Sequence, residues 1–179
     1  MEKDYIQHCL TCRADVVIPL NVGEEKAVAA TKSYLATLSA LLHVVAHWKN
    51  DQSLISAVNQ LPEVLAKTVD EPVQLKAEAV AGVDHLVVMG RGFGYALSRE
   101  VALKLKEVSS IHAEAFSSAE FLHGPVTLVE QGLAILNCEV NDESAQSHQE
   151  QINEMAERGA DLVHLRQTDP NVHPRLAPL

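Results

Sequence analysis

The sequence predicts an α/β fold in which helices cover both faces of a parallel sheet. Short apolar runs suited to buried strands occupy 85–89, 133–137 and 161–165, and longer stretches with helical periodicity occupy 95–109 and 144–158. Strands that alternate with helices of ten or more residues are typical of a parallel sheet with right-handed crossovers. Aromatic residues make up only 4% of the chain, so Ala, Val, Leu and Ile must build the core of this three-layer, flavodoxin-like or Rossmann-like arrangement.

The N-terminal part predicts one strand followed by helices. The run 15–20 is apolar enough for a short buried strand, and a long helix is expected over 24–49. Gln52–Val69 predicts a second helix interrupted near Pro62, and a third helical segment is expected over 71–82. Apolar side chains recur every three or four positions along the first helix: Tyr34, Leu35, Leu38, Leu41, Leu42, Val45 and Trp48.

The order of these elements predicts two parts, one over residues 1–70 and one over 71–179. The first strand leads straight into helices without sheet neighbours, which predicts the end of a partial domain. The second part holds most of a sheet but stops soon after its last strand. We therefore expect one nearly complete domain preceded by a partial one, and a chain truncated at both ends.

Composition and charge exclude several classes of function. The 179 residues include 14 Lys and Arg against 24 Asp and Glu, a net charge of -10, which disfavours nucleic-acid binding. The most apolar stretch, 34–48, is short and interrupted by polar residues, and Met1–Asp4 begins no signal peptide. We expect a soluble cytoplasmic protein that does not contact a membrane.

The three cysteines predict neither a disulfide framework nor a metal site. Cys9 and Cys12 form a single C-x-x-C beside His8, but Cys138 lies far away in an apolar run. A structural zinc ion needs four ligands. Reduced thiols without a metal ion are therefore expected here.

A glycine-rich turn separates the strand 85–89 from the next helix. Gly90, Gly92 and Gly94 could direct backbone N–H groups toward an anion, or could simply permit a tight turn. The dinucleotide-binding pattern is absent because Tyr95 stands where its third glycine would fall. Arg91 could contact a phosphate or lie in solvent.

The helix after this turn carries three ionisable residues on one stripe. Glu100, Lys104 and Glu107 are spaced i, i+4 and i+7, which suits either a surface ion-pair ladder or a carboxylate base beside a lysine. The following stretch, 111–116, looks irregular and adds His112 and Glu114. His123 follows a few residues later. These groups are expected to gather around the C-terminus of the helix.

Two motifs resemble the sugar-isomerase (SIS) domains of phosphosugar isomerases. Lys104-Leu-Lys-Glu107, Ile111-His-Ala-Glu-Ala115 and His123-Gly-Pro125 resemble the second SIS domain of the isomerase half of glucosamine-6-phosphate synthase and of hexosamine-6-phosphate deaminases. Val28-Ala-Ala-Thr-Lys32 resembles the helix start that closes the sugar site in the first SIS domain. The resemblance covers nearly the whole chain.

The resemblance implies a role for each matching residue. Glu107 corresponds to the base that moves a proton between C1 and C2, and His123 to the ring-opening histidine, which reaches the site of an adjacent subunit. A homodimer is therefore implied, with a sugar phosphate as substrate, and the resemblance implies no metal or organic cofactor. The remaining implied site residues are the charged neighbours Lys104 and Glu100, the sugar-contacting Val28, Ala30 and Thr31, and Arg91 of the glycine-rich turn.

The resemblance favours deamination of glucosamine 6-phosphate to fructose 6-phosphate and ammonia through an enediol or enolamine. Ala30 stands where the synthase usually has Ser, and neither Cys9 nor Cys12 resembles a glutaminase nucleophile. Two alternatives stay open: the isomerase domain of a glutamine-fructose-6-phosphate transaminase and a non-catalytic sugar-phosphate sensor. The family's phosphate loops should precede Asp15 and its C-terminal lysine should follow Leu179, so the chain alone could be inactive.

The remaining histidines have no predicted role. His43 and His47 are spaced i, i+4, which permits metal binding, but no carboxylate accompanies them. The other histidines are expected at the surface: His8, His148, His164 and His173.

Overall fold

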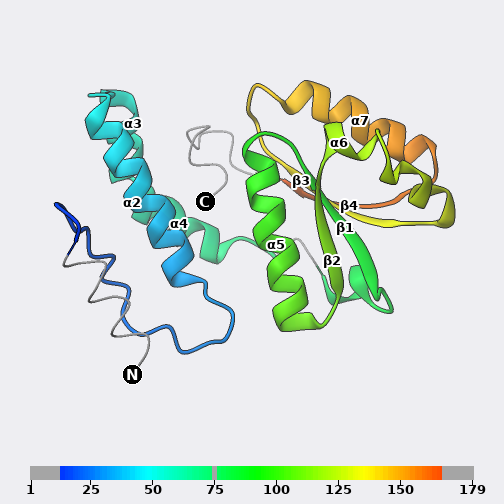
Figure 1. The fold of residues 1–179 in the computed structure, drawn as a ribbon, viewed down its shortest axis with the longest axis horizontal. Coiled ribbons are helices and arrows are strands. Elements are labelled where there is room, and N and C mark those ends of the chain that lie inside the picture. Colours follow the sequence, from blue (N-terminus) through cyan, green and yellow to red (C-terminus); the bar gives the residue numbers. More distant parts are fainter. Residues whose placement is uncertain (1–12, 74–75, 167–179) are drawn as a thin grey trace. The chain divides into compact units, whose positions relative to one another are not determined.

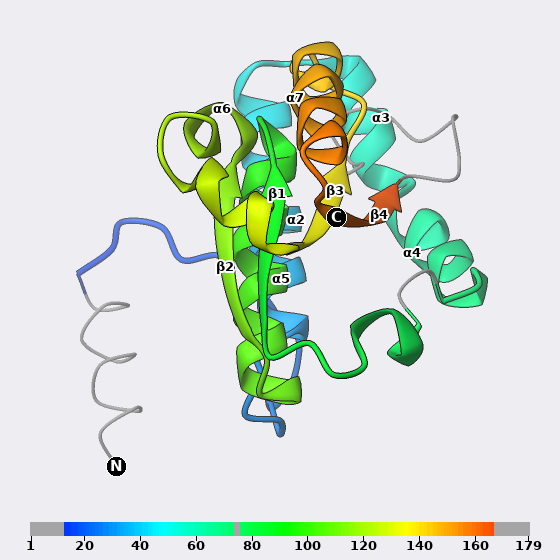
Figure 2. The same ribbon diagram turned by 90° about the vertical axis from the view of Figure 1, so that its right-hand side faces the viewer.

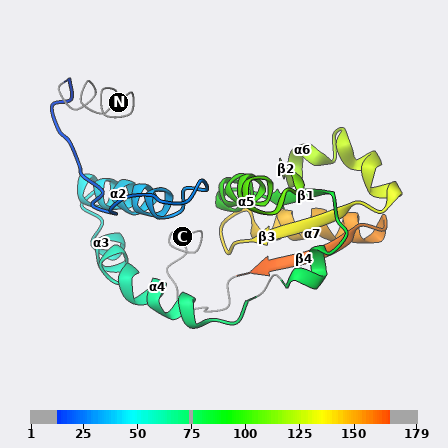
Figure 3. The same ribbon diagram turned by 90° about the horizontal axis from the view of Figure 1, so that it is seen from below.

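A parallel sheet of four strands organises the larger of the two compact units, 1–55 and 56–179, into which contacts divide the chain (Figure 1). The computed structural model describes residues 13–73 and 76–166. The strands are β1 (His85–Gly90), β2 (His112–Ser117), β3 (Ala134–Glu139) and β4 (Asp161–Arg166), in the order β2-β1-β3-β4. β1 and β2 run side by side (Figure 2), and β4 pairs with β3 (Figure 3). In the register of the first pair, His85 stands opposite His112.

Helices cover both faces of this sheet because the residues of β1 alternate between them. Leu86 and Val88 join the core under α5 (Phe93–Ser109), and Val87 and Met89 join the opposite core. The opposite face is covered by α6 (Ser118–Phe121), the 3₁₀ segment η2 (Pro125–Gln131) and α7 (Ala145–Glu157). The parallel α/β fold predicted from the sequence is confirmed.

One strand of the sheet was not expected. The stretch 111–116 was predicted to be irregular, but residues 112–117 form β2 and pair with all of β1. Only Ala113 in this segment is well buried among exposed His112 and Glu114, so the apolar signal of a strand is weak. Residues 112–117 form a strand because their backbone hydrogen-bonds to β1, and their side-chain pattern does not predict it.

The segment 15–20 forms no strand, which corrects the sequence prediction. Its residues are exposed, including Val16, Val17 and Ile18. A strand needs a hydrogen-bonded neighbour, and no strand of the described residues pairs with this segment.

The helices before β1 are shorter than the apolar pattern suggests. α2 begins at Lys32 and ends at Trp48, so residues 24–31 are not helical. The predicted break near Pro62 is confirmed, since α3 (Gln52–Asn59) and α4 (Leu61–Asp70) meet at Gln60 with Pro62 in the first turn of α4. In the stretch 71–82, where residues 71–73 and 76–82 are described, the helical part is the short 3₁₀ segment η1 (Ala77–Val80).

Candidate functional site

The three charged residues predicted on one stripe of α5 form an ion-pair ladder. Lys104 Nζ lies 2.9 Å from Glu107 Oε2 and 3.2 Å from Glu100 Oε1. Each side chain retains between 19% and 30% of its exposure, so the ladder is partly shielded but open to a ligand. The hydrogen bond from Lys104 to Glu107, opposed by desolvation and aided by Glu100, raises the pKa of the lysine. Lys104 is therefore a fixed positive charge beside the carboxylate of Glu107.

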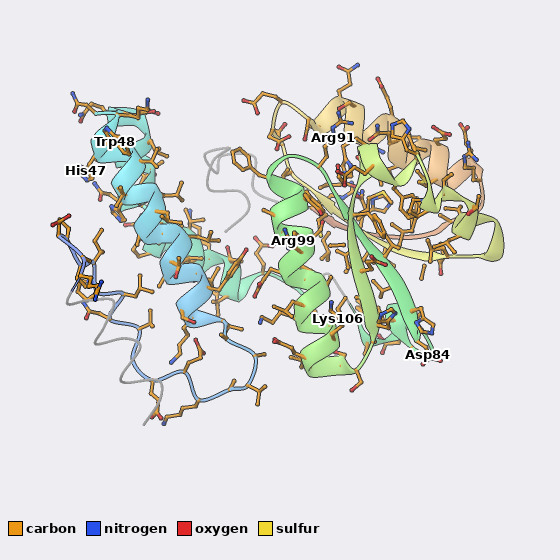
Figure 4. All side chains as sticks on the ribbon, in the orientation of Figure 1. His47, Trp48, Asp84, Arg91, Arg99 and Lys106 are labelled. Atoms are coloured by element: carbon orange, nitrogen blue, oxygen red, sulfur yellow. The ribbon has the colours of Figure 1, made fainter. Side chains whose placement is uncertain are left out.

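This ladder runs from the middle of α5 toward the end farthest from the glycine-rich turn. Figure 4 shows Arg91 and Lys106 at opposite ends of the helix. From Phe93 to Glu107 the helix rises about 20 Å at 1.5 Å per residue. Arg91 and Glu107 of one chain therefore cannot contact the same small substrate.

The sheet also separates Glu107 from His123. Ala102 and Leu105 of the ladder helix pack on one face of the sheet, whereas Phe121, two residues before His123, is fully buried in the core on the other face. His123 is exposed just after α6, where its backbone N–H bonds to the carbonyl of Glu120. The expectation that His123 gathers at the C-terminus of α5 is wrong for a single chain, because the sheet lies between them.

The predicted sugar-contacting residues lie in the segment just before α2. Val28, Ala30 and Thr31 are exposed, with Val28 96% accessible. Thr31 stands at the N-cap position but makes no side-chain capping bond. Instead Glu25 Oε2 accepts bonds from the backbone N–H of Ser33 at 3.1 Å and from its hydroxyl at 3.0 Å. The backbone bond from Ser33 is the main cause that lowers the pKa of Glu25, and this capping role was missed in the sequence.

The glycine-rich turn owes its glycines to close packing. A Cβ at Gly90 would lie 2.3 Å from the carbonyl oxygen of Gly94, and one at Gly94 would lie 2.9 Å from that of Cys138. Gly92 adopts a φ of 56°, and its Cβ would meet Asp142 at 2.5 Å. These contacts explain the tight turn without any ligand.

A carboxylate from the chain itself occupies the N-terminus of α5. Asp142 Oδ2 accepts the backbone N–H of Phe93 at 3.0 Å, and its Oδ1 accepts that of Ser144 at 2.8 Å. Burial raises the pKa of Asp142, but the bonds from Ser144 and Phe93 outweigh it and the pKa is lowered overall. An anionic side chain is thus already placed where the turn would have held an external anion.

Arg91 is anchored to α7. Its Nη1 donates to Gln151 Oε1 at 3.1 Å, so the side chain neither extends freely into solvent nor lies beside Glu107. Its predicted contact with substrate stays a prediction.

Two histidines expected at the surface are not there. His148 is only 4% exposed, and His164 is half-buried against Glu139. The spacing of His148 with Ile152 and Met155, the buried residues of α7, is i, i+4 and i+7, which is the signal that could have placed it in the core. His8, His173, Cys9 and Cys12 lie outside the described residues.

The described residues show no arrangement for a metal ion. Among residues 13–73 and 76–166, no group of three or more His, Cys, Asp or Glu side chains could hold one. His43 and His47 stack with ring centroids 6.4 Å apart. Cys138 is buried, and desolvation raises the pKa of its thiol to about 11. Within the same ranges no helix is long and apolar enough to cross a membrane.

The protein belongs to the class of α/β domains, because its parallel sheet lies between two helical layers. An ion-paired glutamate on one covering helix is a group suited to acid–base chemistry. The SIS domain model matches residues 80–176, and the chain belongs to this family.

Two similar proteins are matched over most of the chain. The chain is 35% identical over 166 residues to a glutamine–fructose-6-phosphate aminotransferase [isomerizing] from Symbiobacterium thermophilum, covering 86% of the chain and 27% of that protein. It resembles the C-terminal domain of a glucosamine-fructose-6-phosphate aminotransferase from Francisella tularensis at 30% identity and a TM-score of 0.78, covering 94% of the chain and 55% of that chain.

A glucosamine-6-phosphate deaminase from Thermotoga maritima has a similar fold, with a TM-score of 0.68 at 22% identity over 95% of the chain and 53% of that chain. The chain therefore spans about a quarter of the length of the curated relatives it matches and about half of these solved chains.

Proposed function

We propose that this chain supplies the base of a phosphosugar aldose–ketose isomerase and deaminase that converts glucosamine 6-phosphate to fructose 6-phosphate and ammonia. The observation that carries the proposal is the ladder on α5, where Lys104 holds Glu107 at 2.9 Å. The similarity to aminotransferases that isomerise a hexose phosphate supports the same chemistry. We further propose a cytoplasmic enzyme.

The proposed reaction needs one base that serves two neighbouring carbons. Glu107 takes the proton from C2 of the open-chain amino sugar, the C–H electron pair becomes the C1=C2 bond, and the C1 carbonyl oxygen gains a proton. Return of the proton to C1 moves the double bond to C2=N. Water then hydrolyses this imine, releasing ammonia and leaving the C2 ketone. Lys104 Nζ lies 2.9 Å from Glu107 Oε2 and holds the side chain of the proposed base in place.

A second copy of the chain completes the proposed site. His123 is the proposed ring-opening residue, yet in one chain the sheet lies between it and Glu107. A site that uses both residues therefore takes Glu107 from one protomer and His123 from its partner. We propose a homodimer on this ground, with Val28, Ala30, Thr31 and Glu100 as further substrate contacts. Arg91, which cannot reach the substrate of Glu107 in its own chain, would come from the protomer that supplies His123.

The isomerase half of a glutamine-dependent aminotransferase is the second candidate. The similar proteins of this kind at 31–35% identity favour it, whereas Ala30 and the deaminase-like motif around it favour ammonia release. A sugar-phosphate sensor would need neither a base nor a ring-opening group, so the presence of both Glu107 and His123 favours an enzyme.

Product analysis distinguishes the candidates. Purified protein is incubated with glucosamine 6-phosphate while ammonia and fructose 6-phosphate are measured, and separately with fructose 6-phosphate while glucose 6-phosphate is measured. A deaminase gives ammonia and fructose 6-phosphate in equal amounts, whereas isomerisation without ammonia supports the second candidate. Binding of the sugar phosphate without either product, unchanged by Glu107→Gln, would refute both enzymatic proposals.

A further inference from the structure

Three polar side chains are buried where the strands end and α7 begins. Ser118 follows β2 and is 0% exposed, Asn137 lies in β3 and is 0% exposed, and His148 in the first half of α7 is 4% exposed. His148 lies between the other two, with Nδ1 at 2.9 Å from Ser118 Oγ and Nε2 at 2.7 Å from Asn137 Oδ1. Burying such groups is costly unless each donor meets an acceptor, so the protons of this network can be counted.

Arg91 determines the direction of the bonds on one side of His148. A guanidinium only donates, so the atom of Gln151 that faces Arg91 at 3.1 Å must be the amide oxygen. The same oxygen lies 2.5 Å from Ser118 Oγ, and Ser118 must therefore donate its single hydroxyl proton to it. Toward His148 the hydroxyl oxygen can then only accept, and Nδ1 must carry a proton.

Glu139 determines the direction on the other side. Its carboxylate only accepts, so the atom of Asn137 at 3.1 Å from Oε1 is the NH₂ group. The amide oxygen of Asn137 therefore faces Nε2 of His148 and accepts from it. Every bond of the network is satisfied only when both ring nitrogens of His148 are protonated, that is, when the ring is an imidazolium.

Burial opposes that charge. Desolvation is the largest cause that lowers the pKa of His148 below its ordinary value. The charged groups that face it are Glu139 of β3 and Asp142 before α7, which favour the proton, and Arg91 after β1 and His164 of β4, which oppose it. All hydrogen bonds of the network are therefore made only at a pH below the ordinary pKa of histidine. At neutral pH the ring of His148 lacks one of its two protons.

The missing proton is taken from Nδ1, because the two neighbours of the ring differ in freedom. Asn137 cannot turn its amide without directing its oxygen at the carboxylate of Glu139. The hydroxyl of Ser118 can turn about its C–O bond and donate to Nδ1 instead. Its oxygen and that of Gln151 then face each other at 2.5 Å without a proton between them, so they must separate.

We infer that His148 is a buried proton switch that controls how Arg91 is anchored. With the proton bound, Ser118 holds Gln151 and Gln151 holds Arg91. Without it, Gln151 is displaced from Ser118 and the guanidinium of Arg91 changes position at the carboxyl end of β1. This inference deepens the proposed function, since Arg91 is a proposed substrate contact, but the switch itself requires no substrate.

The experiment follows both ends of the network by NMR, without substrate. The ring nitrogens of His148 and the side-chain Nε of Arg91 are monitored from about pH 5 to pH 8, the range in which histidine titrates. We expect one transition with a common midpoint, below which both ring nitrogens are protonated and above which only Nε2 is. The Arg91 resonance should shift in the same transition.

Ser118→Ala separates the relay from a general pH effect. It removes the hydroxyl between the ring and Gln151, so His148 should still titrate while the shift of Arg91 is lost. His43→Gln, on α2, is the matched control and should leave both curves unchanged. An Arg91 resonance that ignores the titration of His148, or that follows it equally in Ser118→Ala, overturns the inference, as does a ring neutral or doubly protonated at every pH. None of these outcomes depends on turnover, so they leave the proposed enzyme activity to its own test.

Discussion

The clearest test of the glycine-rich turn is the removal of Asp142, whose carboxylate caps α5. In Asp142→Ala the backbone N–H groups of Phe93 and Ser144 both lose their acceptor. A lost helix cap costs about 1 kcal/mol and a lost hydrogen bond about 1 kcal/mol more, so the free energy of unfolding should fall by roughly 2 kcal/mol. Asp142→Asn keeps one acceptor oxygen and should lose about half as much.

Urea denaturation followed by circular dichroism measures these differences at neutral pH. Glu143→Ala is the matched control, because the neighbouring carboxylate is exposed. The pKa of Asp142 is lowered in the folded state, so its contribution is complete above the ordinary pKa of about 4 and is lost as the pH falls through the lowered value. An Asp142→Ala variant as stable as the control would refute the capping role and reopen the turn to an external anion.

Three further predictions concern other parts of the second unit. Glu107→Gln should lower turnover by about 10²- to 10⁴-fold while the free energy of unfolding changes little. The control Glu154→Gln breaks the exposed pair with Arg158 on α7 and should leave turnover unchanged. Equal turnover in the two variants would contradict the role of Glu107 as base. Phe121→Ala should cost about 3–5 kcal/mol of unfolding free energy, because the ring is fully buried against the sheet; a cost below about 1 kcal/mol would contradict that packing. Cys138, whose burial raises the thiol pKa to about 11, should react with iodoacetamide far more slowly in the folded than in the unfolded protein, as peptide mass spectrometry would show; equal rates would contradict its burial.

The elements that sequence patterns predicted well are those whose signals are local. β1 and β3 are apolar runs buried on both faces, and α5 shows its periodicity over four turns. β2 was missed because its outward side chains, His112 and Glu114, hide the alternation typical of a strand, and only pairing with β1 makes it regular. The opposite error occurred at 15–20, where an apolar run predicted a strand. The segment forms none, because a strand needs a hydrogen-bonded neighbour.

In the candidate site, too, residue spacing predicted the local features and the fold decided the long-range ones. The ladder of Glu100, Lys104 and Glu107 follows from residue spacing alone, because positions i, i+4 and i+7 share one side of any helix. Resemblance added roles to Glu107 and His123, but their separation by the sheet became visible only in the fold.

Long-range contacts were beyond the reach of sequence patterns for a physical reason. Asp142 meets the N-terminus of α5 across 49 positions of the chain, and His148 meets Ser118 across 30. Helical spacing is a property of a few consecutive residues, whereas these bonds depend on the order β2-β1-β3-β4 that brings the carboxyl ends of the strands together. The residues alone therefore predicted the class of fold and the charged stripe on its helix, whereas the packed sheet decided which charges face one another and placed Glu107 and His123 on opposite sides of the strands.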